Sequence, residues 1–182
     1  KGCSYAVIDE AEYYDSANNQ LILVDNVLLT LQTLARYHRA QLGTPVIGIT
    51  GTNGKTTTKE LIATVMNSQY NTHYTKGNLN NSIGVPLTLL QLKPEHEYAI
   101  IEMGASHPGD IEELVNICLP NYGLITNVGK AHLLGFGSFE GVIKTKGELY
   151  DFIRSNGGHI FINGNNSYLL NIADGIENTR YG

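Results

Sequence analysis

The sequence is poor in cysteine and in positive charge, and it has no long hydrophobic run. Two cysteines, Cys3 and Cys118, provide no disulfide framework and fit a reducing cytosol, so a cytoplasmic location is expected. No apolar run approaches the roughly 20 residues that a membrane helix needs, and no stretch reads as a signal peptide. With 12 Lys and Arg against 17 Asp and Glu, the net charge is −5, which argues against a nucleic-acid surface or a polybasic membrane patch.

What is present suits one globular domain or one and a half. The 182 residues are 42% hydrophobic and 16% charged, which is enough to bury a substantial core. The chain opens at KGCSYAVIDE, without a starting Met, and it ends at NTRYG, where another strand could begin. We therefore expect a fragment of a longer protein.

The first 44 residues differ in pattern from the rest. They predict short strands at 5–8 and 21–24, and then a helix that Asp25 or Asn26 caps and that runs to about Leu42. Gly43-Thr44-Pro45 breaks the chain, so we predict a first domain over 1–44 and a second over 45–182. The apolar face of the helix is predicted to consist of Val27, Leu31, Leu34 and Ala35.

From residue 45 onward, strand and helix patterns alternate, which predicts an α/β fold with a mostly parallel sheet flanked by helices. Apolar runs such as Ala99-Ile100-Ile101 are typical of interior strands. The predicted strands span 46–50, 71–75, 98–103, 123–127 and 159–163. The predicted helices span 56–68, 81–92, 109–119, 139–154 and 166–173.

A glycine-rich stretch, GITGTNGKTTTKE at 48–60, stands between the first of these strands and its helix. Such a turn leaves backbone N–H groups at the positive end of the helix dipole, where they bind phosphate. Gly51 and Gly54 allow close approach, Lys55 adds a positive charge, and the Thr56 hydroxyl suits a magnesium ion.

The loop departs from the usual G-x-x-x-x-G-K-[ST] pattern, because Ile49 stands in place of its first glycine. The shorter GTNGKTT disfavours ordinary small GTPases and nucleoside kinases. A Gly/Asn turn with an accidental lysine is the alternative, but the flanking strand and helix favour a site for a nucleoside triphosphate.

Two later strand ends carry groups that could complete such a site. Glu102 ends the strand in AIIEMGA, and it is a plausible magnesium ligand or water orienter. His132 follows another strand end in the glycine-rich loop of LITNVGKAHLLGFGS. An exposed strand-end glutamate and a surface histidine are the alternatives.

Helix phase distinguishes two lysines in FEGVIKTKGELYDFI. Lys144 lies four residues from both Glu140 and Glu148, so these charges are expected to pair on a solvated face. Lys146 falls on the opposite, apolar face, where an ammonium is costly unless it is paired, neutral or chemically altered. A neutral lysine amine can react with carbon dioxide to give a carbamate that binds magnesium; a snorkelling side chain is the alternative.

These stretches together resemble the Mur ligases of peptidoglycan synthesis, and among them the MurF type. The likeness rests on TGTNGKTTTKE, GNLNNSIGVPLTLL and EMGASHPGDIEELVNICLPNYGLITNVGKAHLLGFGSFEGVIKTKGELY, and it covers essentially the whole chain. One departure is Leu134, where Glu is more usual. The resemblance implies that 1–44 end a UDP-substrate domain and that 45–182 form most of the central ATP-binding domain.

The resemblance also implies roles for individual residues. Thr56 and Glu102 would hold one Mg²⁺, His132 would help to hold a second, and Lys146 would be carbamylated. Lys55, Glu102, His132 and Lys146 would be the catalytic residues, and Asn80 and Asn81 would lie near the substrate. The residues that would grip the ATP phosphates are Gly51, Thr52, Asn53, Gly54, Lys55, Thr56 and Thr57.

The implied reaction is the ATP-driven addition of D-alanyl-D-alanine to UDP-N-acetylmuramoyl-tripeptide through an acyl phosphate. A MurE-type ligase and a folylpolyglutamate synthetase are the related alternatives, and the GNLNN and AHLxGFGS segments weigh against both. An inactive nucleotide-binding module is the alternative from a different class.

Overall fold

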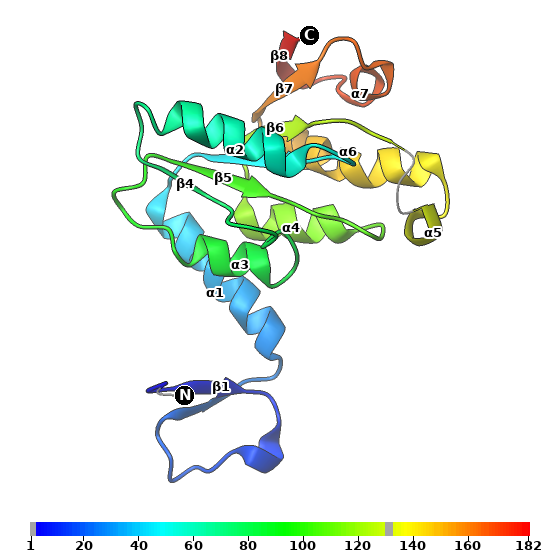
Figure 1. Cartoon of the computed structure of the whole chain (residues 1–182). Helices are drawn as coiled ribbons and strands as arrows, with labels where there is room; N and C mark the ends of the chain where they lie inside the picture. Colours follow the sequence, from blue (N-terminus) through cyan, green and yellow to red (C-terminus); the bar gives the residue numbers. More distant parts are fainter. Residues whose placement is uncertain (1–2, 130–132) are drawn as a thin grey trace.

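Figure 1 shows the computed structural model of the chain, which describes residues 3–129 and 133–182. Its body is a six-stranded sheet in the order β4-β5-β3-β6-β7-β8, and all of its strand pairs are parallel. The predicted α/β fold with a parallel sheet is confirmed. The strands are β3 (Val46–Thr50), β4 (Thr72–Tyr74), β5 (Tyr98–Glu102), β6 (Tyr122–Ile125), β7 (His159–Asn163) and β8 (Glu177–Tyr181).

Helices join these strands and divide the core between the two faces of the sheet. Val46 and Ile101 belong to the larger hydrophobic cluster, which includes residues of α3, α4, α6 and α7. Their alternates Ile47 and Ile100 belong to the smaller cluster, with Ala63 of α2. The helices are α2 (Lys55–Met66), α3 (Gly84–Leu89), α4 (Asp110–Cys118), α5 (Leu133–Phe136), α6 (Phe139–Ser155) and α7 (Ser167–Ile172). Within the described ranges, no helix has the length and apolar character needed to cross a membrane.

The N-terminal part forms a separate small sheet. Strands β1 (Ala6–Ile8) and β2 (Leu21–Leu23) pair in parallel, with the short 3-10 helix η1 (Ala11–Tyr13) between them. Figure 1 shows this pair at the far end of α1 from the six-stranded sheet. Helix α1 (Val27–Leu42) begins at the predicted cap Asn26, whose side chain accepts a hydrogen bond from the Leu29 N–H, and it ends at Gly43.

The buried face of α1 differs from the predicted one. Leu34 is 53% exposed, and the buried residues are Gln32, Ala35 and Arg39. Arg39 donates to the carbonyls of Cys118 and Leu119 at the end of α4. The polar residues are buried because they satisfy backbone carbonyls, which a hydrophobic pattern does not register. Helix α1 packs on α3 and α4, and the domain boundary at 44/45 stays a prediction.

Candidate functional site

The loop at residues 51–54, which is predicted to bind phosphate (the phosphate loop), joins the buried strand β3 to the N-terminus of α2. Gly54 adopts a left-handed conformation with φ of 78°, and no side chain caps the helix that begins at Lys55. The first backbone bond of the helix runs from the Thr58 N–H to the Gly54 carbonyl. The N–H groups ahead of it therefore lie at the positive end of the helix dipole, an arrangement that binds anions.

A second loop, which follows β6, supports the phosphate loop. The Thr52 N–H donates to the Asn127 carbonyl at 3.0 Å, and the Asn53 N–H donates to the Asn127 side chain at 3.0 Å. The Thr126 hydroxyl donates to the Asn53 carbonyl at 2.7 Å. Gly51 lies directly against Thr126, where a Cβ atom would collide with the hydroxyl. The two loops are thus in direct contact and hydrogen-bonded to each other.

Lys55 folds back over the loop that precedes it. Its ammonium donates to the carbonyls of Gly51 at 2.8 Å and of Thr52 at 3.3 Å. Burial lowers the pKa of Lys55, and the negative charge of Glu102 opposes that effect. The ammonium is therefore anchored beside the helix N-terminus, where it adds positive charge for a phosphate group.

Glu102 ends β5, as predicted, and it is only 1% exposed. Its Oε1 accepts hydrogen bonds from the Thr56 hydroxyl at 3.2 Å and from the Asn80 amide at 2.9 Å. Its Oε2 is buried and has no hydrogen-bond partner among the described residues, although the Lys59 ammonium lies 3.8 Å away. The Thr56 hydroxyl and the Oε1 atom that it contacts are oxygen groups of the kind that magnesium prefers, and they lie beside the N-terminus of α2.

Few protein ligands are available for such an ion. The described ranges contain no cluster of three or more His, Cys, Asp or Glu side chains in a metal-binding arrangement. A magnesium ion bound by Thr56 and Glu102 would thus take its remaining ligands from phosphate oxygens and water, as is usual at phosphate-transfer sites.

Asn80 and Asn81 have different surroundings. Asn80 contacts Glu102, while the Asn81 side-chain oxygen accepts from the N–H groups of Ile83 and Gly84 and so caps α3. Both line a cavity of about 320 Å³ that also borders the chain after β5. Asn80 therefore lies at the candidate site, whereas the Asn81 side chain stabilises the turn that precedes α3.

Helix α6 separates its two lysines as helix phase predicted. Lys144 is exposed, and Lys146 is 3% exposed with its ammonium 5.4 Å from the centre of the Phe136 ring. No described carboxylate lies within ion-pair distance of the Lys146 ammonium. Burial and the nearby positive charge of Lys55 lower the pKa of Lys146 to about 8, against the opposing charges of Asp110 and Glu148.

The predicted pairing of Lys144 with Glu140 and Glu148 is wrong, because Lys144 forms no ion pair with any described residue. The Glu148 carboxylate accepts the N–H groups of Gly109 and Glu112, each at 2.9 Å, and so caps the N-terminus of α4. Backbone N–H groups at a helix N-terminus compete well for a carboxylate, whereas an exposed i,i+4 pair contributes little. His132, the predicted second metal ligand, lies outside the described residues.

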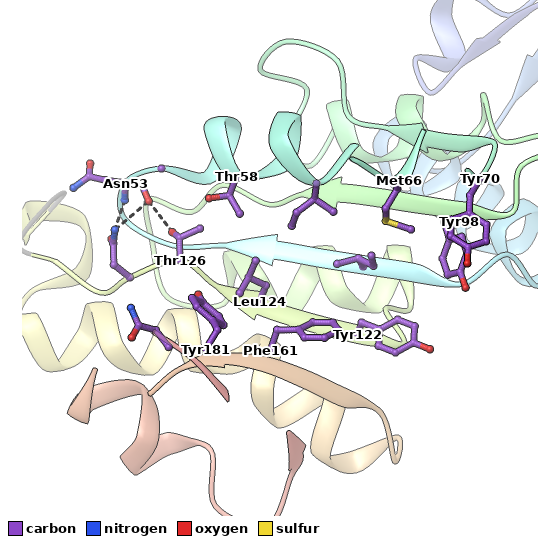
Figure 2. A pocket seen from close by; sticks show the side chains of 15 residues that line it. Asn53, Thr58, Met66, Tyr70, Tyr98, Tyr122, Leu124, Thr126, Phe161 and Tyr181 are labelled. Carbon is purple, nitrogen blue, oxygen red and sulfur yellow. Dashed lines mark hydrogen bonds between the residues drawn. The ribbon is translucent and has the colours of Figure 1, made fainter. Parts of the chain in front are cut away.

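A cavity of about 820 Å³ opens on the face of the sheet that α2 partly covers (Figure 2). Asn53 and Thr126 line its polar end at the phosphate loop. Its floor is apolar and carries Tyr122, Leu124 and Phe161 of β6 and β7. Glu102 and Lys146 do not line it, so the cavity meets the candidate site only at the loop.

Sequence reasoning did not assign three groups that surround the site: Thr126 and Asn127, which support the loop, and Lys59, which approaches Glu102. The position of Thr126 and Asn127 directly after an apolar strand was a usable signal, because ligand sites gather at strand carboxyl ends. For Lys59, neither composition nor motif spacing gave a signal of this kind.

Fold and site together define an α/β protein with a glycine-rich loop between β3 and α2, at the carboxyl-terminal ends of the strands of a parallel sheet. The family model of the Mur ligase middle domain matches residues 49–182, and the chain belongs to the Mur ligase family. The relatives that it matches include ligases of the MurF type. The chain is 42% identical over 165 residues to the UDP-N-acetylmuramoyl-tripeptide–D-alanyl-D-alanine ligase of Bacillus subtilis. The aligned region covers 91% of this chain and 36% of that protein.

Solved structures agree with this assignment. MurF from Acinetobacter baumannii superimposes with a TM-score of 0.89 at 35% identity, over 100% of this chain and 40% of that one. The MurF ligase of Thermotoga maritima, solved in complex with ADP, gives a TM-score of 0.89 at 29% identity, over 100% of this chain and 42% of that one. This chain therefore spans well under half the length of each of these three relatives.

Proposed function

We propose that this chain carries the ATP site of a ligase that joins D-alanyl-D-alanine to UDP-N-acetylmuramoyl-tripeptide. The proposal rests on one observation: the uncapped α2 N-terminus, Lys55 and the Thr56–Glu102 pair lie together at the carboxyl-terminal ends of β3 and β5. The name of the Bacillus subtilis relative supports the substrates, and the ADP complex of the Thermotoga maritima relative supports the nucleotide.

The chemistry begins with attack of the tripeptide's terminal carboxylate on the γ-phosphorus of ATP, which gives an acyl phosphate and ADP. The amine of D-alanyl-D-alanine then attacks the acyl carbon, and inorganic phosphate leaves with one of the original carboxylate oxygens. Lys55 and the α2 N–H groups stabilise the negative charge of the phosphates. Bound magnesium, held by Thr56 and Glu102 with His132 at a second ion, would supply further neutralising charge.

Lys146 is proposed to act as a carbamate. Its amine lies in an apolar setting without a described carboxylate partner, and at a pKa of about 8 roughly a tenth of it is neutral at pH 7. The neutral amine adds to carbon dioxide and loses one proton, and the resulting N–COO⁻ group is anionic. Such a group would add a magnesium-binding carboxylate near Lys55, whose positive charge already acts on the Lys146 amine.

The proposal is tested with the full-length protein that contains this chain. The terminal carboxylate of the tripeptide is labelled with ¹⁸O, and the released phosphate is analysed by mass spectrometry after ligation to D-alanyl-D-alanine. We expect one ¹⁸O atom in each phosphate, because the acyl phosphate bridges through a carboxylate oxygen. Phosphate without label would mean that water attacks ATP and that the activation step is wrong.

A further inference from the structure

Lys59 has a position that the proposed chemistry does not use. It lies on α2, one turn beyond Lys55, and its side chain is fully buried at 0% exposure. An ammonium is rarely buried to this extent unless its donors are satisfied. The groups that meet its ammonium therefore decide what this lysine does.

The contacts of Lys59 are all at the strand ends that carry the site or on α2 itself. Its ammonium donates to the Thr75 carbonyl at 2.7 Å, and it lies 2.9 Å from Oε1 of Glu60 and 3.8 Å from Oε2 of Glu102. The Thr75 hydroxyl in turn accepts the backbone N–H of Glu102 at 3.0 Å. Thr75 thus holds the backbone of Glu102, and Lys59 forms a long ion pair with its side chain.

The opposite side of the same carboxylate faces the candidate metal position. Oε1 is held by the Thr56 hydroxyl and the Asn80 amide, so one oxygen of Glu102 meets the site while the other meets Lys59. The carboxylate is held by two hydrogen bonds at Oε1 and by the positive charge of the Lys59 ammonium on the side of Oε2. Groups of this kind behind a metal ligand orient it and tune its affinity.

We propose that Lys59 is a positioning residue, which holds Glu102 in the orientation that binds the magnesium–nucleotide complex without itself contacting metal or nucleotide. This inference rests on the proposed function, because it assumes that Glu102 meets a nucleotide-bound ion. Lys59 would then contribute to nucleotide binding only when magnesium is present. A lysine that merely anchors α2 to β4 would affect both conditions alike.

The test is ADP binding to the full-length protein by calorimetry, with Mg²⁺ and with EDTA. The metal increment is defined as the Kd in EDTA divided by the Kd in Mg²⁺. We expect Lys59→Met to reduce the metal increment by about 10-fold or more, as for other groups behind metal ligands, and to leave the Kd in EDTA within about twofold of the original. An unchanged increment would overturn the proposal, and so would equal losses in both conditions.

Lys76→Met is the matched control. Lys76 is an exposed lysine over the Tyr74 ring, which Lys59 also approaches, and it has no contact with Glu102. Its metal increment is expected to stay unchanged. Should Lys59→Met fail to fold, Lys59→Gln replaces it: the amide can still donate to the Thr75 carbonyl but carries no charge toward Glu102, so a reduced increment supports the proposal and an unchanged one refutes it. If the unsubstituted protein binds no ADP, or binds it without a metal increment, the proposed function fails instead.

Discussion

Two glycines of the phosphate loop offer a sharp test of how the loop is built. Gly51 and Gly54 both have positive φ, at 144° and 78°, so an alanine at either position strains the backbone by about 1–3 kcal/mol. Only at Gly51 does the added Cβ meet other atoms: it collides with the Thr126 hydroxyl and lies 3.1 Å from the Thr126 nitrogen. At Gly54 nothing lies within 4 Å.

The collision cannot be relieved cheaply, because the Thr126 hydroxyl is held by the Asn53 carbonyl at 2.7 Å. Overpacking of this kind costs a further 1–3 kcal/mol or so. We therefore expect Gly51→Ala to destabilise the chain by about 2 kcal/mol more than Gly54→Ala, which is roughly a 30-fold difference in the unfolding equilibrium.

The assay is urea unfolding of the chain followed by circular dichroism, with the two alanine variants compared side by side. The double variant Gly51→Ala/Thr126→Ala is expected to recover part of the loss, since it removes the colliding hydroxyl and leaves the backbone contact. Equal destabilisation by the two single variants, or a smaller effect at Gly51, would refute the close approach of the two loops.

Three further predictions concern the chemistry of the full-length protein. Lys55→Ala is expected to lower turnover by about 10²–10³-fold, whereas Lys93→Ala, at an exposed position, leaves it unchanged; near-normal turnover of the first would contradict the site. Lys146→Ala should lose turnover and regain part of it with added acetate, and a lack of recovery would argue against the carbamate. At constant carbon dioxide pressure, the ¹³C signal of the carbamate should rise between pH 6.5 and 8.5, because the pKa of about 8 makes the Lys146 amine increasingly neutral over that range. The signal should persist in Lys144→Ala. A signal that is absent at every pH, or that is lost in Lys144→Ala, would exclude Lys146 as its source.

The parts of the site that lie on regular elements were predictable from the sequence. The predicted strands at 46–50 and 159–163 coincide with β3 and β7, and Glu102 ends β5 as expected. Continuous apolar runs fix such strands, since both faces of a parallel sheet are covered. Helix phase alone separated the buried Lys146 from the exposed Lys144.

The parts that depend on polar contacts between distant segments were not predictable. Helix α1 buries Gln32 and Arg39 and exposes Leu34, because its partners are backbone carbonyls and polar side chains on other elements. Glu148 likewise accepts a hydrogen bond at the N-terminus of α4 and does not pair with a lysine of its own helix, because its partner is a backbone group of a distant segment. Lys59 is buried because carbonyl and carboxylate groups from β5 and the end of β4 meet it in space.

The most direct test of the proposed ligase is ADP release by the full-length protein, given ATP, Mg²⁺, UDP-N-acetylmuramoyl-tripeptide and a panel of amines. We expect release to require D-alanyl-D-alanine and to be negligible with single amino acids. Release that depends instead on a single amino acid would keep the ATP site and assign the chain to a sister ligase, and release with no amine dependence would contradict the proposed ligation.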